Sequence, residues 1–243
     1  MNGIIKQVCI DHIYGGIVIG TLKAFWAGLD WSVPINILIS VLPALICITF
    51  HEFSHGFVAY KLGDTTAKDS GRLTLNPIKH IDVMGLAMMV IFKFGWAKPV
   101  PIDMRNFKNP KSGMAVTALA GPLSNIILAA FAFLIFGLFY TPLINAGEAG
   151  HIVLILLQIT AKLSCALAVF NVIPIPPLDG AKVLFSLLPE KQYYSILKYE
   201  RYGFIVLLVI VSLDLITPFI STATESLFNA LSGIAQWAYT LTT

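Results

Sequence analysis

Long apolar segments separated by polar connections dominate the pattern of this chain. Val33 to Phe50 carries no ionisable group except the thiol of Cys47, and the predicted helix continues to Tyr60. Ser112 to Gly147 has no charge for 36 residues, and its central part predicts a second long helix. His151 to Phe170 predicts a third. Because about 20 apolar residues suffice to cross a bilayer, we expect three spanning core helices.

The segments on either side of this core are less regular. His12 to Leu29 is apolar but contains Lys23, so it predicts either a first span or a helix at the membrane surface. Tyr202 to Ile220 predicts a further span, interrupted by a charge and a proline. Glu225 to Thr243 predicts either a last span or a surface helix.

A polar connection follows the first core helix. Alternation over Arg72 to Asn76 predicts a short strand that Asn76-Pro77 ends. Val83 to Phe94 is apolar but too short to cross, and it runs into Gly95 to Pro101. Irregular backbone exposed to lipid is not tolerated. We therefore expect a re-entrant β-hairpin packed against protein.

Together these elements predict an all-α polytopic membrane protein with a three-helix core, flanking spans and a short re-entrant β-hairpin. The composition agrees, since 57% of the 243 residues are hydrophobic, 12% are charged and mean hydropathy is +0.80. The net charge of +3 gives no indication of nucleic-acid binding. We divide the chain into an N-terminal segment (1–32), a membrane-embedded core (33–188) and C-terminal helices (189–243).

The basic residues predict the orientation of the helices. Nine of the sixteen Lys and Arg residues fall in 61–111 and four more in 182–201, whereas 141–150 has none. Because basic loops remain on the cytosolic side, we expect the first two regions in the cytosol and the turn 141–150 outside. We therefore expect a multi-pass integral protein of a prokaryotic cell membrane.

One stretch of the first core helix concentrates reactive side chains. His51 and His55 lie one helical turn apart, so both imidazoles can reach one metal ion. Glu52 lies beside them, where it can hold a water and take its proton. Each such group in a span costs on the order of a few kcal/mol unless it is partnered, which favours a zinc hydrolase site over packed histidines. Cys47, one turn earlier, either faces the metal or is a buried apolar side chain.

The third metal ligand must come from another segment, because a catalytic zinc takes three protein ligands and one open position. Asp179 follows the run Pro174-Ile175-Pro176-Pro177, which cannot continue a helix. Unwound backbone there can turn the carboxylate toward a neighbouring helix. Asp214 lies at a comparable depth, but its segment is continuous until Pro218 and it has a simpler explanation as a polar contact between spans. Asp179 is the favoured ligand and Asp214 the alternative.

Three motifs follow one another along the chain. They are His51-Glu52-x-x-His55, Gly121-Pro122-x-x-Asn125 and Asn171-x-x-Pro174-x-Pro176-x-Leu178-Asp179-Gly180. Together, and with matching stretches at 71–82 and 95–101, they resemble the site-2 protease family of intramembrane zinc metalloproteases. The resemblance covers roughly residues 43–188 and is to the minimal branch without PDZ or CBS domains. It departs at Val83, where the family pattern has proline.

The resemblance implies a metalloendopeptidase that carries out regulated intramembrane proteolysis. It implies one Zn²⁺ per chain, held by His51, His55 and Asp179, with Glu52 as the general base. The implied substrate is a single-span membrane protein or a membrane-bound peptide within the lipid bilayer. No nucleic acid is expected, and the sequence does not indicate an oligomeric state.

Further residues are candidates for contact with the substrate. Asn171 is the leading donor to the tetrahedral oxyanion, although a helix C-cap at the proline break explains it more simply. Asn125 contacts either the substrate or a neighbouring helix. The predicted strand offers an open edge for pairing with unwound substrate. The alternative is a hairpin with a purely structural role. Its residues are Arg72, Leu73, Thr74, Leu75 and Asn76.

Other classes of protein remain open at this stage. A membrane transporter or metal-ion carrier also places His, Glu and Asp in a membrane, but it more often has paired broken helices. A non-catalytic binding member of the family would most easily arise by loss of Glu52, which is present. A different membrane zinc protease would take Glu190 or Glu200 as third ligand, and neither lies in an apolar span.

Overall fold

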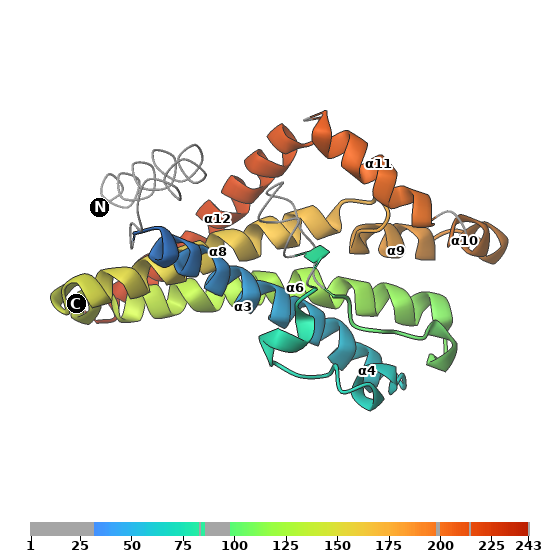
Figure 1. Ribbon diagram of the computed structural model, residues 1–243, viewed down its shortest axis with the longest axis horizontal. Coiled ribbons are helices and arrows are strands. Elements are labelled where there is room, and N and C mark those ends of the chain that lie inside the picture. The colour runs from blue at the N-terminus through green and yellow to red at the C-terminus, as the bar shows by residue number, and fades with distance from the viewer. Residues whose placement is uncertain (1–31, 83, 86–97, 198–199, 214, 243) are drawn as a thin grey trace. The chain divides into compact units, whose positions relative to one another are not determined.

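The computed structural model describes residues 32–82, 84–85, 98–197, 200–213 and 215–242 of the chain (Figure 1). The chain divides into two compact units, Met1–Leu42 and Pro43–Thr243. The first unit is described only where helix α3 begins. All the candidate site residues described below belong to the second unit.

Three long helices confirm the predicted core. They are α3 (Ser32–Lys61), α6 (Pro110–Leu138) and α8 (Glu148–Val172). Within the described residues these are the helices long and apolar enough to cross a membrane, α3 over Val41–Lys61. The start of α6 is fixed locally, because the Asn109 side chain accepts a hydrogen bond from the backbone N–H of Ser112 and Pro110 occupies the first turn.

Helix α6 lies side by side with α8, and both pack against α12 (Thr217–Thr240) (Figure 1). Small side chains allow this close approach, as is usual between membrane helices. At Gly137, a Cβ atom would lie 2.3 Å from the carbonyl oxygen of Ala235 in α12. The rings of Phe133 and Phe228 meet edge to face at 5.0 Å. The other buried members of this cluster are Ala129, Ala132, Ala161 and Cys165.

An exposed apolar stripe runs along α6. Its side chains recur every three or four residues and are Val116, Leu119, Leu123, Ile127 and Phe131. A contiguous stripe of large apolar side chains is unfavourable in water and is expected to face lipid. Together with the three long apolar helices, this stripe defines an integral membrane protein.

The C-terminal part differs from the prediction in one respect. The span predicted over Tyr202 to Ile220, with its interruptions at Asp214 and Pro218, is divided between two helices, since α11 (Glu200–Ser212) ends and α12 begins at Thr217. Pro218 lies in the first turn of α12, where the missing N–H does not disturb the helix, so the proline starts a new helix. The remaining helices are α7 (Tyr140–Asn145), α9 (Asp179–Ser186) and α10 (Glu190–Leu197).

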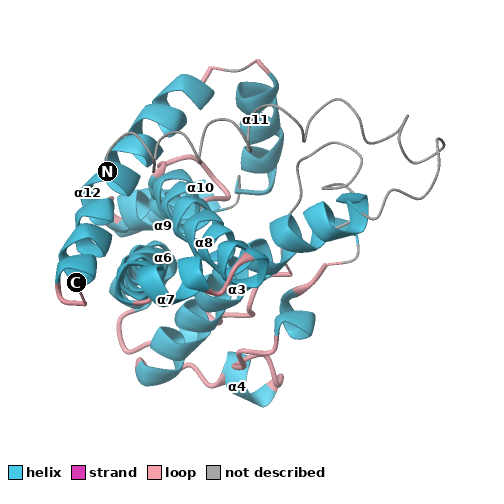
Figure 2. Cartoon of the chain, turned by 90° about the vertical axis from the view of Figure 1, so that its left-hand side faces the viewer, coloured by secondary structure: helices cyan, strands magenta, loops and turns pink. Residues whose placement is uncertain are grey.

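The predicted strand over Arg72–Asn76 is wrong, since no described residue forms a strand (Figure 2). The connection instead holds α4 (Thr66–Asp69) and two 3-10 helices, η1 (Pro77–His80) and η2 (Met104–Asn106). The backbone N–H groups of Arg72 and Leu73 donate to the carbonyl of Ala67, at 2.8 and 3.1 Å. These donors close the turn after α4 and cannot pair with a neighbouring strand. The rest of the predicted hairpin, at 83 and 86–97, lies outside the described residues.

Candidate metal centre

Helix α3 presents two buried histidines on one face. His51 and His55 are 7% and 6% exposed, and their ring centroids lie 4.6 Å apart. Their spacing of four residues places one imidazole above the other along the helix, as the sequence predicts. Helix α3 therefore fixes the positions of the two imidazoles relative to each other.

Asp179 reaches the histidines because α8 ends and the chain folds back. Helix α8 stops at Val172, and the proline run leads to α9, which begins at Asp179. This return is tight, since a Cβ atom on Gly180 would lie 2.0 Å from the carbonyl oxygen of Val172. Asp179 Oδ2 lies 3.1 Å from Nε2 of His51 and 3.1 Å from Nε2 of His55.

The donor set fits a zinc ion. Two donors about 2.0–2.1 Å from a tetrahedral zinc are separated by roughly 3.3 Å, close to the 3.1 Å between Asp179 Oδ2 and each imidazole. All three donor atoms lie within 4.8 Å of one another, and all three residues are buried. Two neutral imidazoles and one carboxylate are a ligand set typical of catalytic zinc, so this group is able to bind the metal.

Helix α6 forms the wall behind both imidazoles. The Nδ1–H of His55 donates to the carbonyl oxygen of Thr117 at 2.7 Å. Asn125 Nδ2 lies 3.3 Å from His51 Nδ1. Between these two residues, a Cβ atom on Gly121 would lie 2.5 Å from His55 Cε1 and 2.6 Å from His51 Cε1. Gly121 therefore provides the space that the two rings occupy.

Glu52 lines a cavity of about 160 Å³ beside this group. Its Oε2 accepts a hydrogen bond from the backbone N–H of Val100 at 2.9 Å. Val100 lies between two prolines, so its N–H is the one backbone donor of that tripeptide. The cavity is lined by His51, Glu52, His55, Pro99, Val100, Ile102, Met114, Thr117, Ala118, Asn171, Pro177, Asp179 and Lys182.

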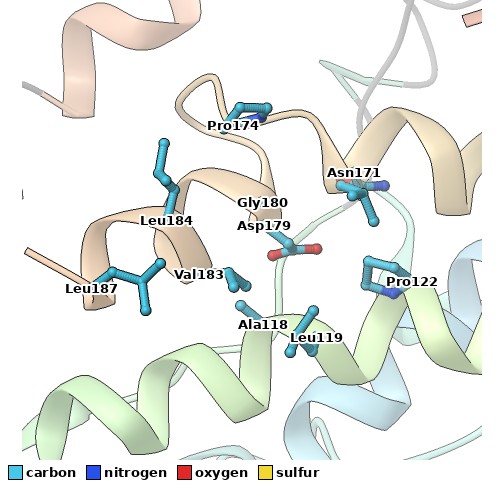
Figure 3. Close-up of a pocket in the computed structure, with 11 residues that line it drawn as sticks. Ala118, Leu119, Pro122, Asn171, Pro174, Asp179, Gly180, Val183, Leu184 and Leu187 are labelled. Carbon is cyan, nitrogen blue, oxygen red and sulfur yellow. The ribbon is translucent and has the colours of Figure 1, made fainter.

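A second, apolar cavity of about 220 Å³ adjoins the first at Asp179 and Asn171 (Figure 3). Figure 3 shows the Asp179 carboxylate between Asn171 at the end of α8 and Ala118 on α6. Asn171 Nδ2 donates to the carbonyl of Leu167 in its own helix, at 3.0 Å. The apolar wall consists of Ala118, Leu119, Pro122, Val172, Pro174, Val183, Leu184 and Leu187.

The other residues that the sequence singled out lie elsewhere. Cys47 does not face the metal group, because its Sγ contacts Ser164 Oγ at 3.1 Å. Glu190 is exposed at the start of α10. Within the matching stretch 71–82, the buried His80 donates its Nε2–H to the carbonyl of Thr74 at 2.8 Å, as an ordinary loop histidine does. Asp214 lies outside the described residues.

Sequence reasoning missed three contributors to the site. Lys182 lies 3.4 Å from Asp179 Oδ1, and the spacing of three residues at a helix start could have indicated it. The Thr117 carbonyl and the Val100 N–H are backbone groups, which no residue type identifies. Gly121 belonged to a recognised motif, but the motif alone did not indicate the space that it leaves for the two histidine rings.

A buried His-His-Asp group with a glutamate beside it, set among helices that can span a membrane, defines a membrane metallopeptidase centre. Comparison with known proteins agrees. The profile of Peptidase family M50 matches residues 142–213. A protein of Bacillus subtilis (strain 168), named "Putative zinc metalloprotease YwhC", is 37% identical over 203 residues, which cover 81% of this chain and 92% of the relative. The chain therefore belongs to peptidase family M50, the site-2 proteases.

More distant relatives carry similar names. "Putative zinc metalloprotease Rip2" of Mycolicibacterium smegmatis is 30% identical over 178 residues, covering 72% of this chain and 65% of the relative. "Zinc metalloprotease MJ0392" of Methanocaldococcus jannaschii is 27% identical over 192 residues, covering 79% of this chain and 45% of the relative. No solved structure matches the chain at a significant level.

Proposed function

We propose that this metallopeptidase hydrolyses peptide bonds in or near transmembrane segments of other proteins, with Glu52 as the general base. The observation that carries the proposal is that Glu52 and the three buried candidate ligands line one cavity. His51, Glu52 and His55 also belong to the apolar stretch Val41–Lys61, so the reaction takes place at membrane depth. The site lies toward the cytosol if the basic connections stay inside.

His51, His55 and Asp179 would hold the zinc ion, which when bound would supply a Lewis acid and lower the pKa of water toward about 7. Glu52 takes the proton of the attacking water and delivers it to the leaving amine. The Val100 N–H holds Glu52 Oε2, which leaves the other carboxylate oxygen for the water. Fixing the base in this way removes the need to orient it during the reaction.

Water and substrate have separate places in this account. The cavity of about 160 Å³ is large enough to hold water beside Glu52. The adjoining apolar cavity is suited to side chains of an unwound membrane segment. Asn171 lies where the two cavities meet, and its amide can turn from Leu167 to donate to the oxyanion.

In the connection after α3, fewer residues than expected remain available for contact with the substrate. Leu75 is half exposed and available to an apolar partner. The Arg72 guanidinium instead donates to the carbonyls of Lys98 and Pro99, at 2.7 and 3.3 Å. Arg72 therefore ties the connection to the segment that carries Val100, and contact with the substrate falls to Thr74, Leu75 and Asn76. The proposed partner remains a single-span membrane protein in a prokaryotic cell membrane.

A cleavage assay on a panel of purified single-span proteins tests the proposal. Zinc-loaded protein in lipid vesicles should cleave at least one of them, and a chelator should stop the reaction. Glu52→Gln should keep its zinc but lose at least about 100-fold in rate, as expected for loss of a general base. Glu148→Gln, an exposed change at the start of α8, is the matched control. Full activity of Glu52→Gln would exclude the mechanism.

A further inference from the structure

Each zinc-binding imidazole needs a partner on its other nitrogen. If Nε2 binds a metal, the proton of the neutral ring lies on Nδ1, which must then donate a hydrogen bond. At His55 this condition is met, because Nδ1 faces the Thr117 carbonyl at 2.7 Å and a carbonyl only accepts. His51 has the same requirement, and its Nδ1 faces the side-chain amide of Asn125.

Asn125 is well placed to meet this requirement. Its side chain is fully buried, and it does not line either of the two cavities beside Asp179. Its Oδ1 has no hydrogen-bond partner among the described residues. An amide can be turned by 180° with almost no change of shape. The orientation in which Oδ1 faces His51 therefore costs no hydrogen bond to Oδ1 among the described residues.

We propose that Asn125 is a positioning residue that accepts the Nδ1–H of His51 through Oδ1 and so presents Nε2 to the metal. This inference rests on the proposed zinc site and replaces the expected substrate contact of Asn125. Thr117, Gly121 and Asn125, spaced by four residues on α6, then act together. The carbonyl orients one imidazole, the glycine makes room for both, and the amide orients the other.

The test measures zinc affinity of purified protein by competition with a chromophoric chelator. Asn125→Leu keeps the branched shape of the side chain but removes the acceptor, and should weaken zinc binding about 10- to 100-fold, the usual effect of losing a group that orients a ligand. Asn125→Asp keeps acceptor oxygens and should stay within a few-fold of wild type. Ser164→Ala is the matched control, because it removes another buried polar contact to α3, at Cys47.

The outcomes separate this inference from the proposed function. Wild-type protein that binds no zinc would overturn both. Zinc-binding wild type with an equally tight Asn125→Leu, or an Asn125→Asp as weak as Asn125→Leu, would overturn the inference alone. A measurement on wild type needs no variant to fold: nitrogen NMR of histidine-labelled, zinc-loaded protein should show the His51 proton on Nδ1. A proton on Nε2 would contradict the proposal.

Discussion

Gly121 illustrates how a single missing side chain can shape a metal centre. The nearest neighbours of its absent Cβ are the two imidazoles, at distances where real atoms do not meet. In a helix, alanine is favoured over glycine by about 1 kcal/mol, so replacement should not harm α6 itself. A methyl group at this position would therefore act mainly by displacing the rings of His51 and His55.

We expect Gly121→Ala to weaken zinc binding at least about tenfold, because the rings of His51 and His55 must shift from the positions in which they meet Asp179. Competition with a chelator measures the change. Gly233→Ala is the control, since a Cβ at that helical position in α12 meets nothing within 4 Å. An unchanged zinc affinity for Gly121→Ala would mean that the rings do not occupy the positions described.

For single residues, the sequence predicted which side chains form the site better than it predicted which groups those side chains contact. His51, His55 and Asp179 come together as expected, because a helical repeat and a proline break are local properties of the chain. The contacts of Thr117 and Val100 depend on backbone groups that meet only after the helices pack. Whether Asn125 faces the substrate or a neighbouring helix also depended on packing, so the sequence left both alternatives open.

The connection between α3 and η2 is held by one buried carboxylate. Asp64 is fully buried and accepts hydrogen bonds from the backbone N–H and hydroxyl of Thr66, the N–H of Asp103 at 2.8 Å, and Asn106 Nδ2 at 2.8 Å. Burial alone would raise the pKa of Asp64, but these hydrogen bonds outweigh it and lower the pKa below its ordinary value. The charged form of Asp64 therefore stabilises the fold.

Asp64→Ala should lower the free energy of unfolding by about 2–4 kcal/mol, since several donors lose a charged acceptor. The pH dependence of stability follows from the direction of the Asp64 pKa shift. A depressed folded pKa gives stability that is present above the unfolded value of about 3.9 and is lost as pH falls through the folded pKa. On acidification below about pH 4, the melting temperature of wild type should thus fall more than that of Asp64→Ala. Asp69→Ala, an exposed carboxylate nearby, is the control; parallel pH curves would contradict the assignment.

Elements with a strong apolar pattern were predicted well, and irregular ones were not. The three core helices agree closely with the apolar segments, because length and hydrophobicity alone decide them. The strand at Arg72–Asn76 failed because Arg72 and Leu73 use their backbone donors on Ala67. The segment 202–220, predicted as one span interrupted by a charge and a proline, forms parts of two helices, because Pro218 lies in the first turn of α12.

The orientation of the whole molecule in the membrane is a separate prediction. In a background where Cys9 is replaced by serine, the remaining Cys47 and Cys165 are buried and should not react. A cysteine at exposed position Lys108 should then be labelled from the cytosolic side, and one at exposed position Ala146 from outside. The asymmetry of basic residues is the reason. Labelling of position 146 from the cytosol would reverse the topology and place the site in the opposite half of the bilayer.

The division of the chain into 1–32, 33–188 and 189–243 stays a prediction. The second of these parts contains all of the candidate ligands and both cavities. Within it, α9 supplies the proposed third metal ligand to two histidines of α3.

Metal analysis of two purified variants tests this claim most directly. Wild type should carry about one zinc per chain, Asp179→Asn should lose both zinc and proteolysis, and Asp214→Asn should keep its zinc and most of its activity. The reason is that Asp179 Oδ2 lies 3.1 Å from both imidazoles and removing its charge removes a ligand. If Asp214→Asn is the variant without zinc while Asp179→Asn retains it, the His51–His55–Asp179 centre is wrong.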